Sequence, residues 1–290
     1  MGKRTDKIEV ILSPLAPCLS PAEPSTAIKS KLEALQRLFG EMGSAIVAFS
    51  GGIDSALVLK VAHETLGSRA IAITAVSPTF PALELETARL VGAEIGARHL
   101  IIETDQLQIP EFSRNDAGRC YHCKTDLYQA LGKMRHEMGI KAIVDGTNVD
   151  DLGDDRPGIT AAREWDVRSL LVEAEISKAE VRALAKDLGL SNWDKPAAAC
   201  LSSRIPRGVV ITREKLSRVE QAEAMLLQEG VRQVRVREQG ETARIELDEG
   251  EMIGMLDAGR RSRISARLKE LGYRFVTLDL EGYRQGGGNR

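Results

Sequence analysis

The run SGGIDS at residues 50–55 has the residue types of a phosphate-binding loop. It follows an apolar stretch at 45–49 and opens a segment with helical spacing. Glycine lets the backbone come close to a ligand, and amides at a helix start attract anions. Ser50 and Ser55 add hydroxyl donors, and Asp54 suits a Mg²⁺ ion that bridges to phosphate. The run lacks the lysine and the glycine spacing of a Walker A motif. It therefore predicts a different kind of nucleotide site, with Mg²⁺.

Three cysteines form a second candidate centre. Cys120 and Cys123 stand close together at the start of an expected helix, and Cys200 follows much later. Two thiolates at this spacing can bind one metal ion or one iron of a cluster, and a third cysteine can complete the site. The residues alone leave three alternatives open. These are an iron–sulfur cluster with one open iron, a zinc ion completed by His122 or His99, and reduced thiols of which Cys200 alone reacts.

The residues that flank this CxxC pair are basic. Arg119 precedes Cys120, and Lys124 follows Cys123. Positive charge and a helix N-terminus both stabilise a thiolate relative to a thiol. We therefore expect the thiolate form to be favoured here.

Charged clusters supply candidates for binding an anionic substrate. Arg235 and Arg237 alternate in an expected strand and so point to one face. Guanidinium groups pair bidentately with phosphate and carboxylate, although a solvated face with surface ion pairs explains the spacing equally well. The candidates are Arg204, Arg207, Arg235 and Arg237. The acidic run Asp150, Asp151, Asp154 and Asp155 is more typical of a solvated loop than of a Mg²⁺ site.

These residues need a scaffold that brings distant segments together. Apolar runs at 45–49, 70–76, 98–102 and 142–144 alternate with helical patterns at 54–66, 82–95 and 123–138. Such alternation predicts an α/β fold, a parallel sheet with helices on both faces. Ligands bind such sheets beyond the carboxyl ends of the strands. The loop at 50–55 and a turn at 145–148 both follow strands, so we expect them to face one site.

The C-terminal part has a different pattern. A helix from Thr212 to Gln228 precedes strands at 231–237 and 243–247, a helix at 259–271 and a strand at 275–280. This predicts a smaller α+β domain. We expect a mobile tail at 1–27, a nucleotide-binding domain at 28–208, and a smaller substrate-binding and assembly domain at 209–290.

The composition argues against several classes of partner. The 290 residues are 43% hydrophobic and 28% charged, which is typical of globular proteins. A net charge of −2 and 4% aromatic residues argue against nucleic acid as a partner. No apolar stretch approaches the roughly 18 residues of a membrane helix, and the first residues lack the features of a secretory signal. We expect a cytoplasmic protein whose cysteines are reduced and which has no membrane partner.

Taken together, the motifs resemble a known family. SGGIDS is similar to the PP-loop of ATP pyrophosphatases, which share an adenine nucleotide alpha hydrolase-like fold. The motifs that follow it in the chain are RCYHCK at 119–124, VDGTNVDD at 144–151, WDKPAAACLSSRIPRG at 193–208, VRVR at 234–237 and VTLDLEGYR at 276–284. The set resembles the LarE family, the sulfur transferases of nickel-pincer nucleotide cofactor synthesis. The similarity covers residues 28–284.

The resemblance implies a reaction and the residues that perform it. ATP adenylates a carboxylate of pyridinium-3,5-biscarboxylic acid mononucleotide, pyrophosphate leaves, and sulfur then displaces AMP to give a thiocarboxylate. Cys200 and Asp54 are the implied catalytic residues, and Arg235 and Arg237 hold the substrate phosphate. The implied nucleotide site is Ser50, Gly51, Gly52, Asp54, Ser55, Gly146, Thr147 and Asn148.

The family has two branches, and the CxxC pair separates them. In one branch a single cysteine gives up its own sulfur, as Cys200 would here. In the other, three cysteines hold a [4Fe-4S] cluster that carries an extra sulfide. With Cys120, Cys123 and Cys200 present, the resemblance favours the cluster branch. It also implies a homo-hexamer, and it leaves the sulfur donor unidentified.

Other functions share parts of this pattern. A tRNA thiolase has the same nucleotide loop but needs a nucleic-acid footprint. An ammonia-dependent ligase such as NAD synthetase also adenylates a carboxylate but needs no cysteines. A non-catalytic nucleotide sensor would bind ATP or AMP without releasing pyrophosphate.

Overall fold

The computed structural model describes residues 26–153, 157–196 and 199–284. Most of the expected tail at 1–27 lies outside these ranges, as do Asp154 and Asp155. None of the helices in the described ranges has the length and apolar character needed to cross a membrane.

A five-stranded parallel sheet forms the centre of the larger part, in the order β3-β2-β1-β4-β5. Its strands are β1 (Ala45–Ala48), β2 (Ala70–Val76), β3 (Arg98–Glu103), β4 (Ala142–Val144) and β5 (Val167–Arg168). The helices of this part are α1 (Thr26–Met42), α2 (Ile53–Leu66), α3 (Ala82–Ile95), α4 (Pro110–Ser113), α5 (Arg119–Glu137), α6 (Pro157–Glu164), α7 (Leu170–Glu173) and α8 (Lys178–Asp187).

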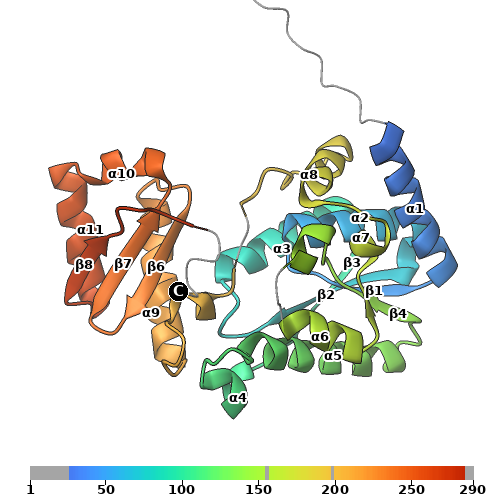
Figure 1. Ribbon diagram of the computed structural model, residues 1–290, viewed down its shortest axis with the longest axis horizontal. Coiled ribbons are helices and arrows are strands. Elements are labelled where there is room, and N and C mark those ends of the chain that lie inside the picture. The colour runs from blue at the N-terminus through green and yellow to red at the C-terminus, as the bar shows by residue number, and fades with distance from the viewer. Residues whose placement is uncertain (1–25, 154–156, 197–198, 285–290) are drawn as a thin grey trace, which may run out of the picture.

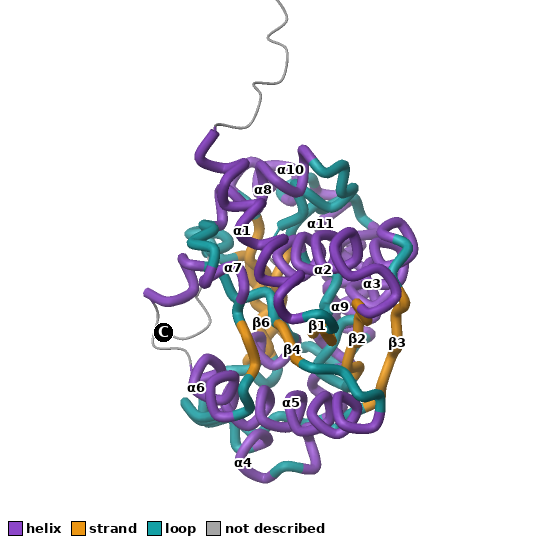
Figure 2. Tube along the Cα trace, turned by 90° about the vertical axis from the view of Figure 1, so that its right-hand side faces the viewer, coloured by secondary structure: helices purple, strands orange, loops and turns teal. Residues whose placement is uncertain are grey.

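Helices cover both faces of this sheet. Figures 1 and 2 show α5 and α6 on one side, and α1, α2, α3 and α8 on the other. The strands alternate accordingly: Ile46 and Ile143 pack with Tyr128 of α5, whereas Val47 and Val144 belong to the core on the α2 side. The predicted α/β architecture is confirmed.

The C-terminal part has a three-stranded mixed sheet in the order β6-β7-β8, with β6 antiparallel and β8 parallel to β7. Its elements are α9 (Arg213–Gln228), β6 (Val234–Gln239), β7 (Thr242–Leu247), α10 (Glu249–Met255), α11 (Ala258–Glu270) and β8 (Phe275–Leu278). Val236, Ile245 and Leu268 lie in a separate apolar core. The smaller α+β unit is thus present, at the left of Figure 1.

A fourth apolar cluster lies where the two parts meet in the chain. Phe112 of α4 packs with Leu201 and Ile205, and with Leu216 and Val219 of α9. This cluster spans the predicted boundary at 208/209, which stays a prediction.

Short elements depart from the sequence-based expectations. The acidic segment after Asp150 was expected to be a loop, but a 3₁₀ turn occupies Val149–Gly153 and helix α6 begins at Pro157. Proline suits the first turn of a helix because its missing N–H has no partner there anyway. The helix expected from Thr212 is present as α9, and the Thr212 side chain caps it by accepting a hydrogen bond from the Lys215 amide.

Candidate active site

The loop at 50–55 is a tight turn between β1 and α2. Gly51 has a φ of +73°, and a side chain there would lie 2.8 Å from the backbone of Ala88 in α3. Glycine is therefore needed both for the left-handed backbone and for the close approach of α3. The hydroxyls of Ser50 and Ser55 lie 3.2 Å apart, and Ser55 Oγ donates to the Gly52 carbonyl at 3.0 Å. These bonds fix the shape of the loop.

The start of α2 is open to an anion. Among the described residues no side chain caps this helix at Gly52, so its first amides have no side-chain acceptor. Unpaired amides and the helix dipole together attract phosphate. The geometry supports the predicted phosphate site, and its nucleotide contacts stay predictions.

A second turn, at 145–148, lies against this loop. It follows β4, which pairs in parallel with β1, so the two carboxyl ends are neighbours. A side chain at Gly146 would lie 2.9 Å from the backbone nitrogen of Ser55. Asn148 Nδ2 donates to Asp54 Oδ1 at 3.1 Å. The two turns form one surface, as expected from the strand order, while the nucleotide roles of Gly146, Thr147 and Asn148 stay predictions.

A buried carboxylate anchors the second turn. Asp145 is 3% exposed and accepts hydrogen bonds from Tyr128 at 3.0 Å and Ser169 at 2.8 Å, and from the Thr147 amide at 3.1 Å. Burial opposes charge on the nearby Lys124, but its electrostatic interactions with Tyr128 and Asp145 outweigh burial and raise the lysine pKa. Lys124 therefore carries a firm positive charge between the turn and Cys123.

Lys178 joins the loop although the sequence analysis did not select it. Its ammonium forms an ion pair with Asp54 Oδ2, and its backbone N–H donates to the carboxylate of Asp150. Lys178 is the first residue of α8, directly after the cap residue Ser177. The available signal was a lysine at a helix start, where a positive charge opposes the dipole.

The three cysteines come from two segments. Cys120 and Cys123 lie in the first turn of α5, and Cys200 precedes a 3₁₀ turn at Leu201–Arg204. Cys120 and Cys200 are exposed, and Cys123 is half-buried. Burial raises the pKa of the Cys123 thiol to about 12, and the charges of Cys200 and Cys120 add to the effect. Charge on either of the other two cysteines would therefore act on Cys123.

The expectation of a favoured thiolate is wrong for Cys123. The sequence analysis weighed Lys124, Arg119 and the helix start, but burial outweighs them. Lys124 does lower the pKa of this thiol, while Arg119 donates to Asn115 Oδ1 at 2.6 Å. Cys123 is thus a neutral thiol at neutral pH in the metal-free protein.

The three cysteine thiols are of the ligand type that binds soft metal ions, and which metal or cluster they bind stays a prediction. No group of three or more His, Cys, Asp or Glu side chains is arranged to hold a metal ion in the described part of the chain. Cysteine thiolates are nevertheless the ligand type that an iron–sulfur cluster needs, and the charges of Cys120 and Cys200 both act on Cys123. Of the zinc alternatives, His99 is occupied elsewhere: its Nε2 lies 2.8 Å from Thr74 Oγ1.

Guanidinium groups hold the Cys200 segment by its carbonyl oxygens. Arg204 donates to the carbonyls of Ala199 at 2.8 Å and Cys200 at 3.1 Å. Arg119 of α5 donates to Ser202 O at 3.0 Å, and Arg237 of β6 donates to Ser203 O at 2.8 Å. The segment is thus fixed from both parts of the molecule.

Asn115 ties α5 to the same segment. It is fully buried and has a φ of +60°, a conformation that asparagine tolerates better than most residues. Its Nδ2 donates to the carbonyls of Ile205 at 3.2 Å, Pro206 at 2.8 Å and Val209 at 3.1 Å. Because its Oδ1 accepts from Arg119, one side chain links the CxxC helix to the chain that follows Cys200.

The four candidate arginines differ in their surroundings. Arg204 and Arg237 are 2% and 6% exposed and form bidentate pairs with Glu223 and Glu246, so they are not part of a solvated face. Arg235 lies over the ring of Tyr283 at 5.1 Å. Burial, and then the charge of Arg204, lower the Arg235 pKa. Arg207 is exposed. Substrate binding by these residues stays a prediction.

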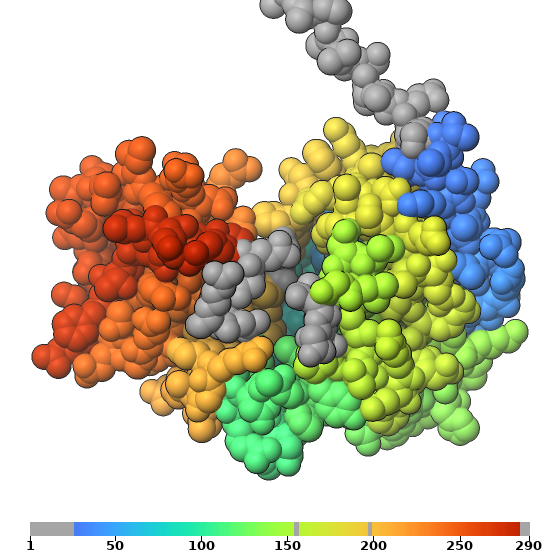
Figure 3. Space-filling view, viewed as in Figure 1, coloured from blue at the N-terminus to red at the C-terminus, as the bar shows by residue number. Residues whose placement is uncertain are grey.

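A cleft opens beside Cys200. Its volume is about 620 Å³, and its walls come from the start of α3, from Lys195 and Pro196, from residues around Cys200, and from α9 and β6. Ala199, Leu201 and Arg204 line one side, and Val234 and Arg235 another. Figure 3 shows the larger and smaller parts meeting along the middle of the molecule.

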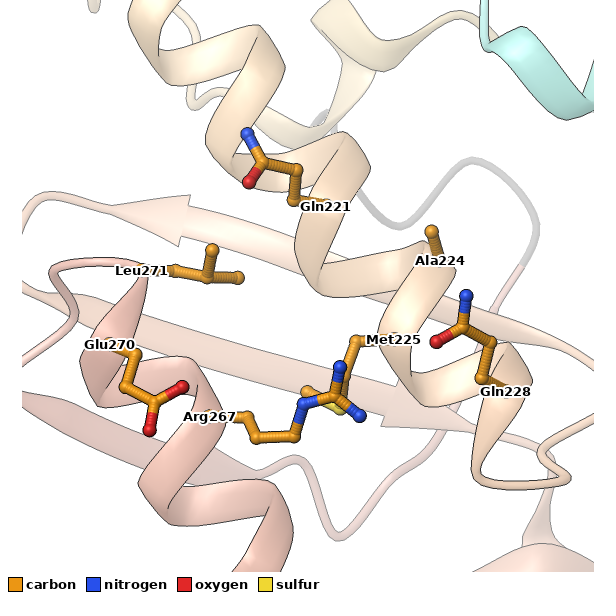
Figure 4. Close-up of a pocket in the computed structure, with 7 residues that line it drawn as sticks. All are labelled: Gln221, Ala224, Met225, Gln228, Arg267, Glu270 and Leu271. Atoms are coloured by element: carbon orange, nitrogen blue, oxygen red, sulfur yellow. The ribbon is translucent and has the colours of Figure 1, made fainter.

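A second pocket lies within the C-terminal part. It has a volume of about 300 Å³ between α9 and α11, and its lining residues include Gln221, Met225 and Arg267 (Figure 4). Neither a cysteine nor a residue of the nucleotide loop lines it, so it is not the predicted active site.

Comparison with known proteins identifies the family. The chain is 38% identical over 266 residues to the pyridinium-3,5-bisthiocarboxylic acid mononucleotide synthase of Lactiplantibacillus plantarum, covering 91% of this chain and 93% of that one. The protein belongs to the LarE family. An uncharacterised protein of Synechocystis is 46% identical over 263 residues, covering 91% of this LarE-family chain and 98% of its own.

More distant relatives connect this LarE-family chain with the wider PP-loop group. The GMP synthase of Aeropyrum pernix is 26% identical over 230 residues, covering 71% of this chain and 43% of that enzyme. No family profile matches the chain. These relatives make the LarE-family protein an ATP-dependent enzyme of the PP-loop group.

Proposed function

We propose that this protein is an ATP-dependent sulfur transferase that converts a carboxylate of pyridinium-3,5-biscarboxylic acid mononucleotide to a thiocarboxylate. One observation carries the proposal. The cleft lined by Arg204 and Arg235 opens beside Cys200, in a chain 38% identical to a synthase of the corresponding bisthiocarboxylic acid.

Adenylation is the first step. A carboxylate oxygen of the substrate attacks the α-phosphorus of ATP, the bond to the β-phosphate breaks, and pyrophosphate leaves with the electron pair. The amides of Gly51 and Gly52 and the hydroxyls of Ser50 and Ser55 bind the leaving phosphates. Asp54 would hold the Mg²⁺ whose charge favours their departure. Gly146, Thr147 and Asn148 border the nucleotide.

Sulfur transfer is the second step. A sulfur nucleophile attacks the activated carbonyl carbon, the C–O bond to AMP breaks, and a thiocarboxylate and AMP result. Cys200 is exposed, and its chain neighbours Ala199 and Leu201 line the cleft, so a nucleophile at position 200 would stand close to it. Arg235 and Arg237 bind the substrate phosphate, with Arg204 and Arg207 beside them.

Cys120, Cys123 and Cys200 would hold a [4Fe-4S] cluster. When bound, such a cluster supplies one iron without a protein ligand, at which an exchangeable sulfide can be carried. The alternative is the single-cysteine mechanism, in which Cys200 gives up its own sulfur. By the same resemblance we propose a cytoplasmic homo-hexamer, with residues 209–290 as the substrate-binding and assembly domain.

The test separates adenylation from sulfur transfer. Pyrophosphate release and thiocarboxylate formation are measured with the pyridinium substrate. Cys200→Ala should keep pyrophosphate release and lose the sulfur product, whereas Asp54→Asn should lose both. The fourth cysteine of the chain, Cys18, is not part of the candidate centre, so Cys18→Ala is the matched control and should behave as wild type. An undiminished sulfur product from Cys200→Ala would overturn the proposal, and a thiolated tRNA or an amide product would favour the other PP-loop functions.

Metal analysis distinguishes the two branches. Protein prepared without oxygen and reconstituted with iron and sulfide should bind about four irons per chain and absorb broadly near ~400 nm. A colourless protein that loses about 34 Da after turnover, the mass of H₂S removed from a cysteine, would instead show Cys200 to be the sulfur donor.

A further inference from the structure

His99 is a polar residue of the larger sheet that has no part in the reaction steps above. It lies in β3, the edge strand next to β2, and is half-buried. A side chain at Gly92 of α3 would lie 3.0 Å from His99 Nδ1, so this glycine leaves room that the imidazole fills. The imidazole also meets the ring of Phe49 edge to face, with the ring centres 5.3 Å apart. The histidine is therefore packed between α3 and the residue that precedes the nucleotide loop.

Two hydrogen bonds connect His99 with Phe49 through Thr74 of β2. Thr74 is 1% exposed, and its Oγ1 donates to the Phe49 carbonyl at 2.7 Å and lies 2.8 Å from His99 Nε2. A hydroxyl has one hydrogen and a carbonyl can only accept, so the hydrogen of Thr74 points to Phe49. His99 Nε2 must therefore carry a hydrogen and donate it to Thr74.

The charge state of His99 agrees with this arrangement. Burial, and then the charge of Arg89, lower the His99 pKa. The imidazole is thus neutral at neutral pH and has a single N–H group. That group is at Nε2, and its hydrogen is committed to Thr74.

Phe49 stands where the chain leaves the sheet. Strand β1 ends at Ala48, and the Phe49 N–H still donates to the Ile73 carbonyl of β2 at 2.9 Å. The Phe49 carbonyl, by contrast, accepts from the side chain of Thr74. This carbonyl and the N–H of Ser50 belong to one planar peptide group. The bond from Thr74 therefore sets the direction of the Ser50 amide, at the first residue of the loop.

Resting on the proposed function, we infer that His99 is a positioning residue for the nucleotide site. Its Nε2–H holds the Thr74 hydroxyl on the Phe49 carbonyl, and the loop at 50–55 leaves β1 in the direction that phosphate binding needs. His99 acts through Thr74 and Phe49 and not by contact with the nucleotide. Donors that are fixed before the ligand arrives bind phosphate without the cost of ordering them.

The experiment measures the dissociation constants of ATP, inorganic pyrophosphate and AMP by calorimetry, with full-length protein in Mg²⁺ buffer. His99→Leu and Thr74→Val each remove one link and should weaken ATP and pyrophosphate about 3- to 10-fold. AMP should change less than about twofold, because it lacks the phosphates that the loop binds. His99→Gln offers an amide donor in place of Nε2–H, and Thr74→Ser keeps the hydroxyl, so both should retain most of the affinity.

A double variant tests whether His99 acts through Thr74. Adding His99→Leu to Thr74→Val should weaken ATP by less than about a further twofold, because the link is already broken. Thr277→Val is the matched control, since it removes a strand hydroxyl that lies 3.5 Å from the Ala243 carbonyl in the smaller sheet. It should bind all three ligands as wild type does.

A merely structural role predicts a different result. Urea unfolding of each variant shows the loss of stability, and calorimetry under conditions where the variants are folded shows the loss of binding. The inference is overturned if His99→Leu and Thr74→Val are less stable but bind ATP normally, or if they lose AMP as strongly as ATP. It is also overturned if His99→Leu keeps its full effect in the Thr74→Val protein. A wild-type protein that binds no ATP and releases no pyrophosphate would instead overturn the proposed function.

Discussion

Replacing Gly146 by alanine tests the contact between the two turns of the nucleotide site. A Cβ at this position would lie 2.9 Å from the nitrogen of Ser55 and 3.2 Å from the carbonyl carbon of Asp54. Gly146 does not have a positive φ, so alanine can adopt its backbone and the effect is one of crowding. Ordinary contacts at a Cβ are 3.4–4 Å, so the two turns must separate by about 0.5 Å in a closely packed region.

Two effects of different size follow from this displacement. Overpacking of a close contact costs about 1–3 kcal/mol of unfolding free energy. The moved atoms are also those that shape the phosphate site, so we expect the dissociation constant of ATP to rise about tenfold. When the ATP concentration is 100 times the wild-type dissociation constant, ATP raises the unfolding free energy of the wild type by about 2.7 kcal/mol and that of the variant by about 1.4 kcal/mol.

The assay is urea-induced unfolding with and without MgATP, together with pyrophosphate release. Gly40→Ala is the control, since a Cβ there meets nothing within 4 Å inside α1. It should raise stability by about 0.5–1 kcal/mol and leave the gain from ATP unchanged. If Gly146→Ala keeps both the wild-type stability and the full gain from ATP, the argument from crowding is wrong.

Further predictions concern the cysteine centre and the contacts that hold the Cys200 segment. Because the pKa of Cys123 is raised to about 12, the rate of its alkylation by iodoacetamide in metal-free protein should keep rising up to about pH 11. The rate is measured by peptide mass spectrometry. A rate that stops rising below about pH 9 would contradict this prediction. The unfolded chain loses that proton near pH ~8.5, so the folded state should lose stability as pH rises from about 9 towards 12. Asn115→Ala removes the donor to three carbonyls and should lower the unfolding free energy by about 2–4 kcal/mol in urea titrations, and a loss below about 1 kcal/mol would refute the linking role. Glu223→Ala leaves the buried Arg204 without its ion-pair partner and should lower the unfolding free energy by about 3–5 kcal/mol. Glu41→Ala removes a partner from a surface ion pair and should lower it by less than about 1 kcal/mol. Equal losses from the two variants would contradict the view that the Arg204–Glu223 pair is buried.

The larger sheet could be predicted from the sequence because its elements have strong local signals. The strand at 70–76 and the helix at 82–95 have the predicted bounds, since apolar runs and helical spacing end at clear boundaries there. Short elements such as β5 and α7 contain too few residues to show a period. These short elements form because their side chains pack into the surrounding core.

The site was predictable where its signal is local. The loop at 50–55 carries its glycines and hydroxyls within a few residues, so the motif stands out. Lys178 and Asn115 act through partners far away in the chain, Asp54 and the carbonyls after Cys200, and no spacing rule connects them. The raised pKa of Cys123 likewise depends on burial, which is a property of the folded chain.

The Cys200 segment is held in place by contacts that do not involve the cysteine side chain. Three arginines, Arg204, Arg119 and Arg237, donate hydrogen bonds to backbone carbonyl oxygens of this segment. Every amino acid has such an oxygen, so these bonds do not depend on which side chain stands at position 200. Replacing the side chain at position 200 should therefore leave the backbone of this segment in place. Whichever of the proposed sulfur chemistries takes place at position 200, it would thus depend on the side chains around that position and not on the anchorage of the backbone.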